Sequence, residues 1–237
     1  MATEIRLRKH PKRVNIIQGF PGFGLIGTIA TEFLLQHLKC ELIGKYWFET
    51  LPATVAIHNE QVVNPVGIYY NEKYNIVIIH GITAAAGIEW QLADLILKIA
   101  KDLDAYQIIN LEGIASKDIK ENPEVFFFST HEDIKEKIKG LGITPLKEGI
   151  IMGVSSALML KDDINLVSFF VEAHSELPDS KAAAELIKVI DKYLNLEVDT
   201  KPLLDAAKRF EKKLNELVEQ SSLIKKKMSQ KQLNYVG

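Results

Sequence analysis

The chain turns at Gly19-Phe20-Pro21-Gly22-Phe23-Gly24-Leu25-Ile26-Gly27, a glycine-rich stretch between two regular segments. Residues 14–18 before it have the β-branched content of a short buried strand. Residues 25–38 after it repeat apolar side chains at helical spacing. A strand, a glycine-rich turn and a helix in this order begin an α/β sheet.

Inside the turn, residues 22–27 match G-x-G-x-x-G, the pattern of dinucleotide-binding turns. In such turns the backbone N–H groups at the start of the helix bind the pyrophosphate. An acidic residue about 20 positions later binds the ribose, and Glu49 takes that place. Pro21, however, lies where a nucleotide loop normally runs freely, and the glycines would also let helix and strand pack closely. The residues favour a structural turn, with nucleotide binding as the open alternative.

Apolar runs alternate with amphipathic segments along the rest of the chain. We predict strands at residues 42–48, 75–79, 106–111 and 166–171, a hairpin with arms 55–57 and 61–70, and a short strand or apolar lid at 125–128. We predict helices at residues 88–103, 132–139, 149–160 and 179–194. This order predicts an α/β fold with a mixed, mostly parallel sheet flanked by helices.

Composition indicates a globular protein. The chain has 237 residues, of which 47% are hydrophobic and 25% charged, enough for a sizeable core. The apolar runs stay below the roughly 18 residues of a membrane span and residues 1–13 lack the apolar segment of a leader, so we expect neither anchor nor signal peptide. The single cysteine, Cys40, cannot pair within the chain, which favours a reducing compartment.

Charge is distributed unevenly behind the net value of −2. Residues 1–13 carry five basic side chains and one acidic one, and residues 201–237 carry nine basic and four acidic ones, so the body between them is acidic. Basic ends are compatible with nucleic-acid binding. Since aromatic residues are not interleaved with these charges, we expect no nucleic-acid partner and favour solvated ends or docking to acidic protein surfaces.

The C-terminal region predicts a separate helix over residues 199–228, with Pro202 in its first turn. Its apolar positions follow a 4-3-4-3 spacing over about three heptads, the pattern of a helix that packs on one partner helix. The stripe comprises Leu203, Ala207, Phe210, Leu214, Leu217, Ser221 and Ile224, and we assign Leu203, Phe210, Leu214, Leu217 and Ile224 to an oligomer seam. The predicted organisation is a core domain over 1–198, this helix, and a flexible tail over 229–237.

Several polar residues follow predicted strands, where open α/β sheets bind ligands. His80, Glu112 and the glycine turn would line one crevice with Ser155, or would merely hydrogen-bond loops. The segment Gly153-Val154-Ser155-Ser156-Ala157 is similar to the hydrolase elbow G-x-S-x-G. A small-molecule-binding or hydrolytic enzyme using the crevice around Gly22–Gly27, His80 and Ser155 is therefore the alternative function.

A serine hydrolase would need partners for Ser155. Asp163 or Asp179, with His174, would complete a Ser–Asp–His set. The histidines lack metal-ligand spacing and the glycine turns lack a P-loop lysine, so we expect neither a metal site nor a cofactor.

The turn at residues 19–27, read as Gly-x-Pro-Gly-x-Gly-x-x-Gly, resembles the opening motif of the proteasome-assembly-chaperone family in its archaeal branch. Two later stretches are similar to the same family: Gly149-Ile150-Ile151-Met152-Gly153-Val154-Ser155-Ser156-Ala157, and Glu172-Ala173-His174 followed by Pro178-Asp179-Ser180-Lys181-Ala182-Ala183. The resemblance implies a non-enzymatic, cytoplasmic, homo-oligomeric chaperone or adaptor without catalytic residues. Its implied partners are proteasome core subunits or a related small protein, met through the C-terminus.

The chain ends in Leu233-Asn234-Tyr235-Val236-Gly237. Proteasome activators, as the resemblance implies, dock with a terminal hydrophobic-Tyr-any tripeptide. Tyr235 is third from the end, one place too early, which displaces the carboxylate by about 3.3 Å. We predict that Leu233, Tyr235, Val236 and Gly237 contact a partner, with an ordinary disordered end as the alternative.

Overall fold

The computed structural model describes residues 5–49, 55–58, 60–82, 87–115, 122–161, 164–173 and 178–205. The chain divides into two compact units, Met1–Val198 and Asp199–Gly237. In the second unit residues 201–205 are helical. The rest of the predicted helix over 199–228 and the tail over 229–237 lie outside the described residues, so the predicted domain limits stay a prediction.

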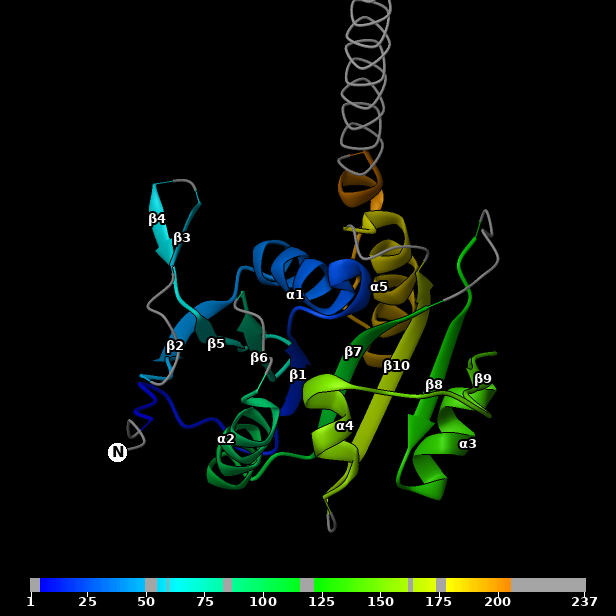
Figure 1. Ribbon diagram of the computed structural model, residues 1–237, viewed down its shortest axis with the longest axis horizontal. Coiled ribbons are helices and arrows are strands. Elements are labelled where there is room, and N and C mark those ends of the chain that lie inside the picture. The colour runs from blue at the N-terminus through cyan, green and yellow to red at the C-terminus, as the bar shows by residue number, and fades with distance from the viewer. Residues whose placement is uncertain are drawn as a thin grey trace, which may run out of the picture. The chain divides into compact units, whose positions relative to one another are not determined.

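The first unit is built on an eight-stranded sheet in the order β2-β5-β6-β1-β7-β10-β8-β9 (Figure 1). Strands β6, β1, β7 and β10 are parallel, whereas β5 is antiparallel to β2 and β6, and β8 is antiparallel to β10. The strands are β1 Asn15–Gly19, β2 Glu41–Tyr46, β5 Val66–Asn71, β6 Ile76–Gly81, β7 Gln107–Ala115, β8 Val125–Ser129, β9 Thr144–Pro145 and β10 Leu166–Ala173. The predicted mixed, mostly parallel sheet is confirmed.

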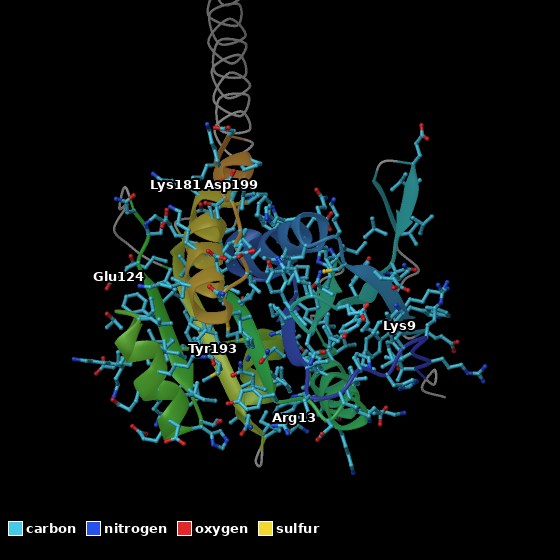
Figure 2. The ribbon with its side chains drawn as sticks, turned by 180° about the vertical axis from the view of Figure 1, so that it is seen from behind. Lys9, Arg13, Glu124, Lys181, Tyr193 and Asp199 are labelled. Atoms are coloured by element: carbon cyan, nitrogen blue, oxygen red, sulfur yellow. The ribbon has the colours of Figure 1, made fainter. Side chains whose placement is uncertain are left out.

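Helices cover both faces of this sheet. Helices α2 Glu89–Asp102 and α4 Gly153–Met159 lie side by side on the near face in Figure 1, while α1 Ile26–His37 and α5 Ser180–Leu194 pack together on the opposite face. Helix α3 Glu132–Gly140 packs against β8. Every residue of β6 is buried, as expected of a central strand between two helical layers. On the α5 side, Tyr193, labelled in Figure 2, donates a hydrogen bond to Gln107 at 2.9 Å.

The predicted hairpin forms, but its second arm does not continue into one long strand. Strands β3 Ala56–His58 and β4 Gln61–Val63 make a separate two-stranded ribbon that stands off the main sheet (Figure 1). Pro65 follows β4, and β5 begins only at Val66. Because proline has no N–H to donate to a ladder, the chain leaves the ribbon there before it joins the sheet.

Two boundaries differ from the predictions in ways that matter for the site. Strand β7 runs to Ala115, so Glu112 lies within the strand rather than after it. Helix α4 begins at Gly153, where φ is +80°, and not at residue 149. Residues 149–152 are therefore not helical, and Ile150 is 92% exposed. Among the described residues, no helix combines the length and apolarity that crossing a membrane requires.

Candidate functional site

The glycine-rich turn lies at the carboxyl end of β1 and is packed against neighbouring backbone. A Cβ atom on Gly19 would lie 2.1 Å from the carbonyl oxygen of Gly27, and one on Gly27 would lie 2.6 Å from the carbonyl oxygen of Leu111 in β7. The amide of Asp179 donates a hydrogen bond to the Gly24 carbonyl at 3.0 Å. These glycines therefore allow strand, turn and helix to approach within distances that side chains would prevent, which supports the structural interpretation of the turn.

Three buried polar residues form a row across adjacent parallel strands next to this turn. Gln18 of β1 is aligned with Asn110 of β7, which is aligned with Ser168 of β10. Gln18 Nε2 donates to Asn110 Oδ1 at 2.9 Å, and Asn110 Nδ2 donates to Ser168 Oγ at 3.0 Å. Each of these polar residues interrupts an apolar run, which the sequence shows. The sequence does not show that the three residues are aligned on neighbouring strands. The row fixes the register of three strands.

Glu112 extends this polar cluster toward the turn. Ser155 Oγ of α4 donates to Glu112 Oε2 at 3.0 Å, and Ser155 also accepts from Gln18 Nε2 at 3.2 Å. A Cβ atom on Gly22 would lie 2.1 Å from Glu112 Oε1, so the turn leaves just enough space for this carboxyl group. The residue keeps some exposed surface, but its carboxyl group is buried. This burial raises the pKa of Glu112 to about 7. The hydrogen bonds from Ser155 and the Gly113 backbone lower the pKa, but by less than burial raises it.

His80 lies on the other face of the sheet, so the predicted single crevice of His80, Glu112 and Ser155 is wrong. His80 Nδ1 is 2.8 Å from Thr31 Oγ1 of α1, whereas Glu112 and Ser155 lie on the α4 face. Its Nε2 is 3.2 Å from Glu32 Oε2, close enough for an ion pair when the ring is protonated but without hydrogen-bond alignment. Side chains alternate between the faces of a strand, and the register places His80 and Glu112 on opposite ones.

The predicted ribose-binding residue is also misplaced for a nucleotide site. Glu49 follows β2, and β2 is separated from β1 by β5 and β6. A ribose-binding carboxylate belongs on the strand next to the glycine turn, so Glu49 cannot serve the turn in that way.

Ser155 does not have the geometry of a nucleophile. It is fully buried inside α4, and the residues before α4 do not form the strand that a nucleophile elbow requires. Asp179 caps α5, accepting a hydrogen bond from the Ala182 amide at 2.9 Å. Asp163 and His174, the other proposed partners, lie outside the described residues. The hydrolytic alternative is therefore not favoured.

Metal and thiol chemistry find no support in the part of the chain that the structure describes. Within it, no group of three or more His, Cys, Asp and Glu side chains could hold a metal ion. Burial raises the pKa of Cys40 to about 12, which keeps its thiol protonated at neutral pH.

The PAC2 family model matches residues 16–218 of the chain. The chain belongs to the PAC2 family. The fold of this chain recurs in solved archaeal structures. PbaA of Pyrococcus furiosus, described as an archaeal homologue of a proteasome-assembly chaperone, is 28% identical with a TM-score of 0.83, covering 96% of this chain and 97% of that one. PbaB of the same organism, described as an archaeal proteasome activator, is 25% identical with a TM-score of 0.77, covering 90% and 98%.

An uncharacterised protein of Methanocaldococcus jannaschii is 26% identical over 208 residues, which is 86% of this PAC2 chain and 85% of that protein. The resemblance to the proteasome-assembly-chaperone family that residues 19–27 indicated is thus confirmed. Most of the predicted contact residues, however, lie outside the described part of this PAC2 protein. Only Leu203 of the seam lies inside it. The residues outside it are Phe210, Leu214, Leu217 and Ile224 of the seam, and Leu233, Tyr235, Val236 and Gly237 of the tail.

The described surface of this PAC2 protein also carries exposed apolar side chains that sequence reasoning did not identify. Ile57 on the β3–β4 ribbon is 75% exposed, and Val55 and Val62 are exposed beside it. Ile150 and Met152 are exposed on the segment before α4. The alternation of apolar residues predicted strands, but it could not tell that one pair of strands stands apart from the core.

Proposed function

We propose that this PAC2 protein is a non-enzymatic chaperone or adaptor of the proteasome-assembly-chaperone type. The observation that carries the proposal is the similarity to PbaA along nearly the whole of both chains. The partners would be proteasome core subunits or a related small protein, met in the cytoplasm.

The chemistry of the described surface supports a role in protein binding. The polar groups at the carboxyl edge of the sheet, Gln18, Asn110, Glu112 and Ser155, are engaged with one another. Large apolar side chains, by contrast, are exposed on the β3–β4 ribbon and before α4. Exposed apolar groups that gather on an element mark protein-interaction surfaces. These four polar residues therefore act inside the fold, whereas the exposed aliphatic side chains are suited to contact another protein.

Within this function we assign oligomer formation to the helix over residues 199–228 and partner contact to the tail. The heptad seam of Leu203, Phe210, Leu214, Leu217 and Ile224 offers a narrow apolar stripe for a second helix. A single tail would bind weakly, because ordering a flexible segment costs free energy. Several tails on one oligomer would bind more tightly, since each later contact is intramolecular.

A surface-binding assay with archaeal proteasome core particles tests the proposal. The full chain is compared with a form lacking residues 232–237, with Tyr235→Ala, and with Asn234→Ala as the matched control. Loss of an aromatic anchor typically costs about 2 kcal/mol or more, so Tyr235→Ala should weaken binding about 30-fold while Asn234→Ala should not. Equal binding by all four forms would reject tail docking, and no binding by the full chain would reject core particles as the partner.

A further inference from the structure

A pocket of about 460 Å³ opens at the β2 edge of the sheet, away from the glycine turn. Three cationic side chains, Arg6, Arg8 and Lys45, line it together with Trp47 and Asn64. From this combination we propose that the pocket binds an acidic peptide segment, with glutamate or aspartate carboxylates against the cations and an apolar side chain against Trp47.

The first wall of the pocket is the N-terminal segment, which runs alongside β2. The Arg8 amide donates a hydrogen bond to the Ile43 carbonyl of β2 at 2.7 Å. Leu7 is turned toward the protein, since a Cβ atom on Gly44 would lie 2.7 Å from its Cδ2. Arg6 and Arg8 are exposed on the other side. This alternation follows from an extended backbone, and it places two guanidinium groups at the pocket.

The second wall is β2 itself, the outermost strand of the sheet. Tyr46 is buried and packs edge-on against Phe48, with ring centroids 4.9 Å apart. Lys45 and Trp47 therefore lie on the opposite side, where Lys45 Nζ is 5.9 Å from the centroid of the Trp47 ring. Trp47 keeps 41% of its surface exposed. Two extended segments thus bring three positive charges and one aromatic ring to the same hollow.

The cationic side chains of this pocket are not ion-paired with the described residues around it. Nearby Lys9, labelled in Figure 2, is paired with Glu41 at 2.6 Å. Among the described residues, no carboxylate forms an ion pair with Arg6, Arg8 or Lys45. Like charges held together without counter-charges attract anions, and guanidinium groups bind carboxylates through paired hydrogen bonds.

The size and position of the pocket favour a peptide over a nucleic acid. A volume of this order accommodates a few side chains, whereas single-stranded nucleic acid needs a longer basic groove and several stacking platforms. The wall also includes the aliphatic side chain of Leu42, which suits an apolar side chain next to a carboxylate. The assignment does not depend on the proposed chaperone role.

Tryptophan fluorescence tests this assignment on the purified full chain. Because the chain has two tryptophans, the background variant Trp90→Phe leaves Trp47 as the only reporter. The probe is a blocked hexapeptide in which glutamate alternates with leucine, and the control peptide has glutamine in place of glutamate. We expect saturable binding of the glutamate peptide that weakens as salt is raised, and no binding of the glutamine peptide.

Matched variants locate the binding. Arg6→Gln combined with Arg8→Gln should weaken peptide binding about tenfold, the effect of two exposed charge pairs. Lys135→Gln combined with Lys139→Gln changes the net charge equally on α3 and should leave affinity unchanged. Lys45→Gln tests the other wall and decides the matter if the arginine variant does not fold.

Three results would overturn the assignment. The first is equal affinity for the glutamate and glutamine peptides. The second is unchanged affinity in both pocket variants, or equal loss in the α3 control. The third is tighter binding of inorganic phosphate or of a deoxythymidine hexamer than of the glutamate peptide, which would make the pocket a phosphate site.

Discussion

Glu112 makes the stability of this protein depend on pH in a direction that can be calculated. Burial raises the pKa of its carboxyl group from the usual 4.5 to about 7. Between these two values the folded protein binds more protons than the unfolded chain, so stability falls as pH rises through this window. At lower pH the group is neutral in both states and costs nothing.

The size of the effect follows from the two pKa values. One pKa unit corresponds to about 1.4 kcal/mol, so the shift from 4.5 to about 7 makes the full cost of ionising Glu112 in the folded protein about 3.5 kcal/mol well above neutral pH. Glu112→Gln removes the ionisation while keeping an oxygen that accepts the hydrogen bond from Ser155. The free energy of unfolding of the variant minus that of wild type should therefore increase by about 2.5 kcal/mol as the pH rises from about 5 to about 8.

Urea denaturation followed by circular dichroism at several pH values measures this difference. Glu148→Gln serves as the control, because that side chain is exposed on the segment before α4. The control should track wild type at every pH. If the Glu112→Gln and wild-type stability curves run parallel across the window, the carboxyl group is not desolvated as described and the reasoning fails.

Further predictions concern the turn, the polar row and the seam. Gly27→Ala should destabilise the fold by about 3 kcal/mol or more, because its methyl group would meet the β7 backbone at 2.6 Å. Gly140→Ala is the control in thermal melts, and it should be neutral or stabilising because the space around Gly140 is open. Ser168→Ala should cost about 1–3 kcal/mol in denaturation by leaving a buried amide unpaired; no loss would contradict the buried row. Leu214→Asp with Leu217→Asp should lower the oligomer order in sedimentation, and an unchanged profile would count against the seam.

The sequence allowed the turn, the alternation of strands and helices, and the family to be predicted because each rests on local residue patterns. The glycine spacing at residues 19–27 and the apolar run of β6 are examples. The position of a polar residue on one face or the other depends instead on the register between strands. His80 and Glu112 both follow apolar runs in the sequence, yet the sheet separates them.

The pocket at β2 that we assign to an acidic peptide also could not be predicted from local sequence patterns. Its walls come from residues 6–8 and 45–47, two segments that neither periodicity nor composition connects. The basic character of the N-terminus was visible, and docking to acidic surfaces was an expectation drawn from it. Which strand the N-terminus lies against depends on which end of the sheet β2 occupies, a question of topology that local patterns leave open.

The position of β1 also has a consequence for how the chain is made. Although β1 precedes the other described strands in the chain, it lies inside the sheet, and Gln18 pairs with Asn110, which lies 92 residues further along. At roughly 5–20 residues per second, synthesis leaves that strand without this neighbour for on the order of ten seconds. During that interval Ile16 and Ile17, fully buried in the finished protein, lack the neighbours that bury them. A protein proposed to assist the assembly of others would thus itself expose apolar residues while it is being synthesised.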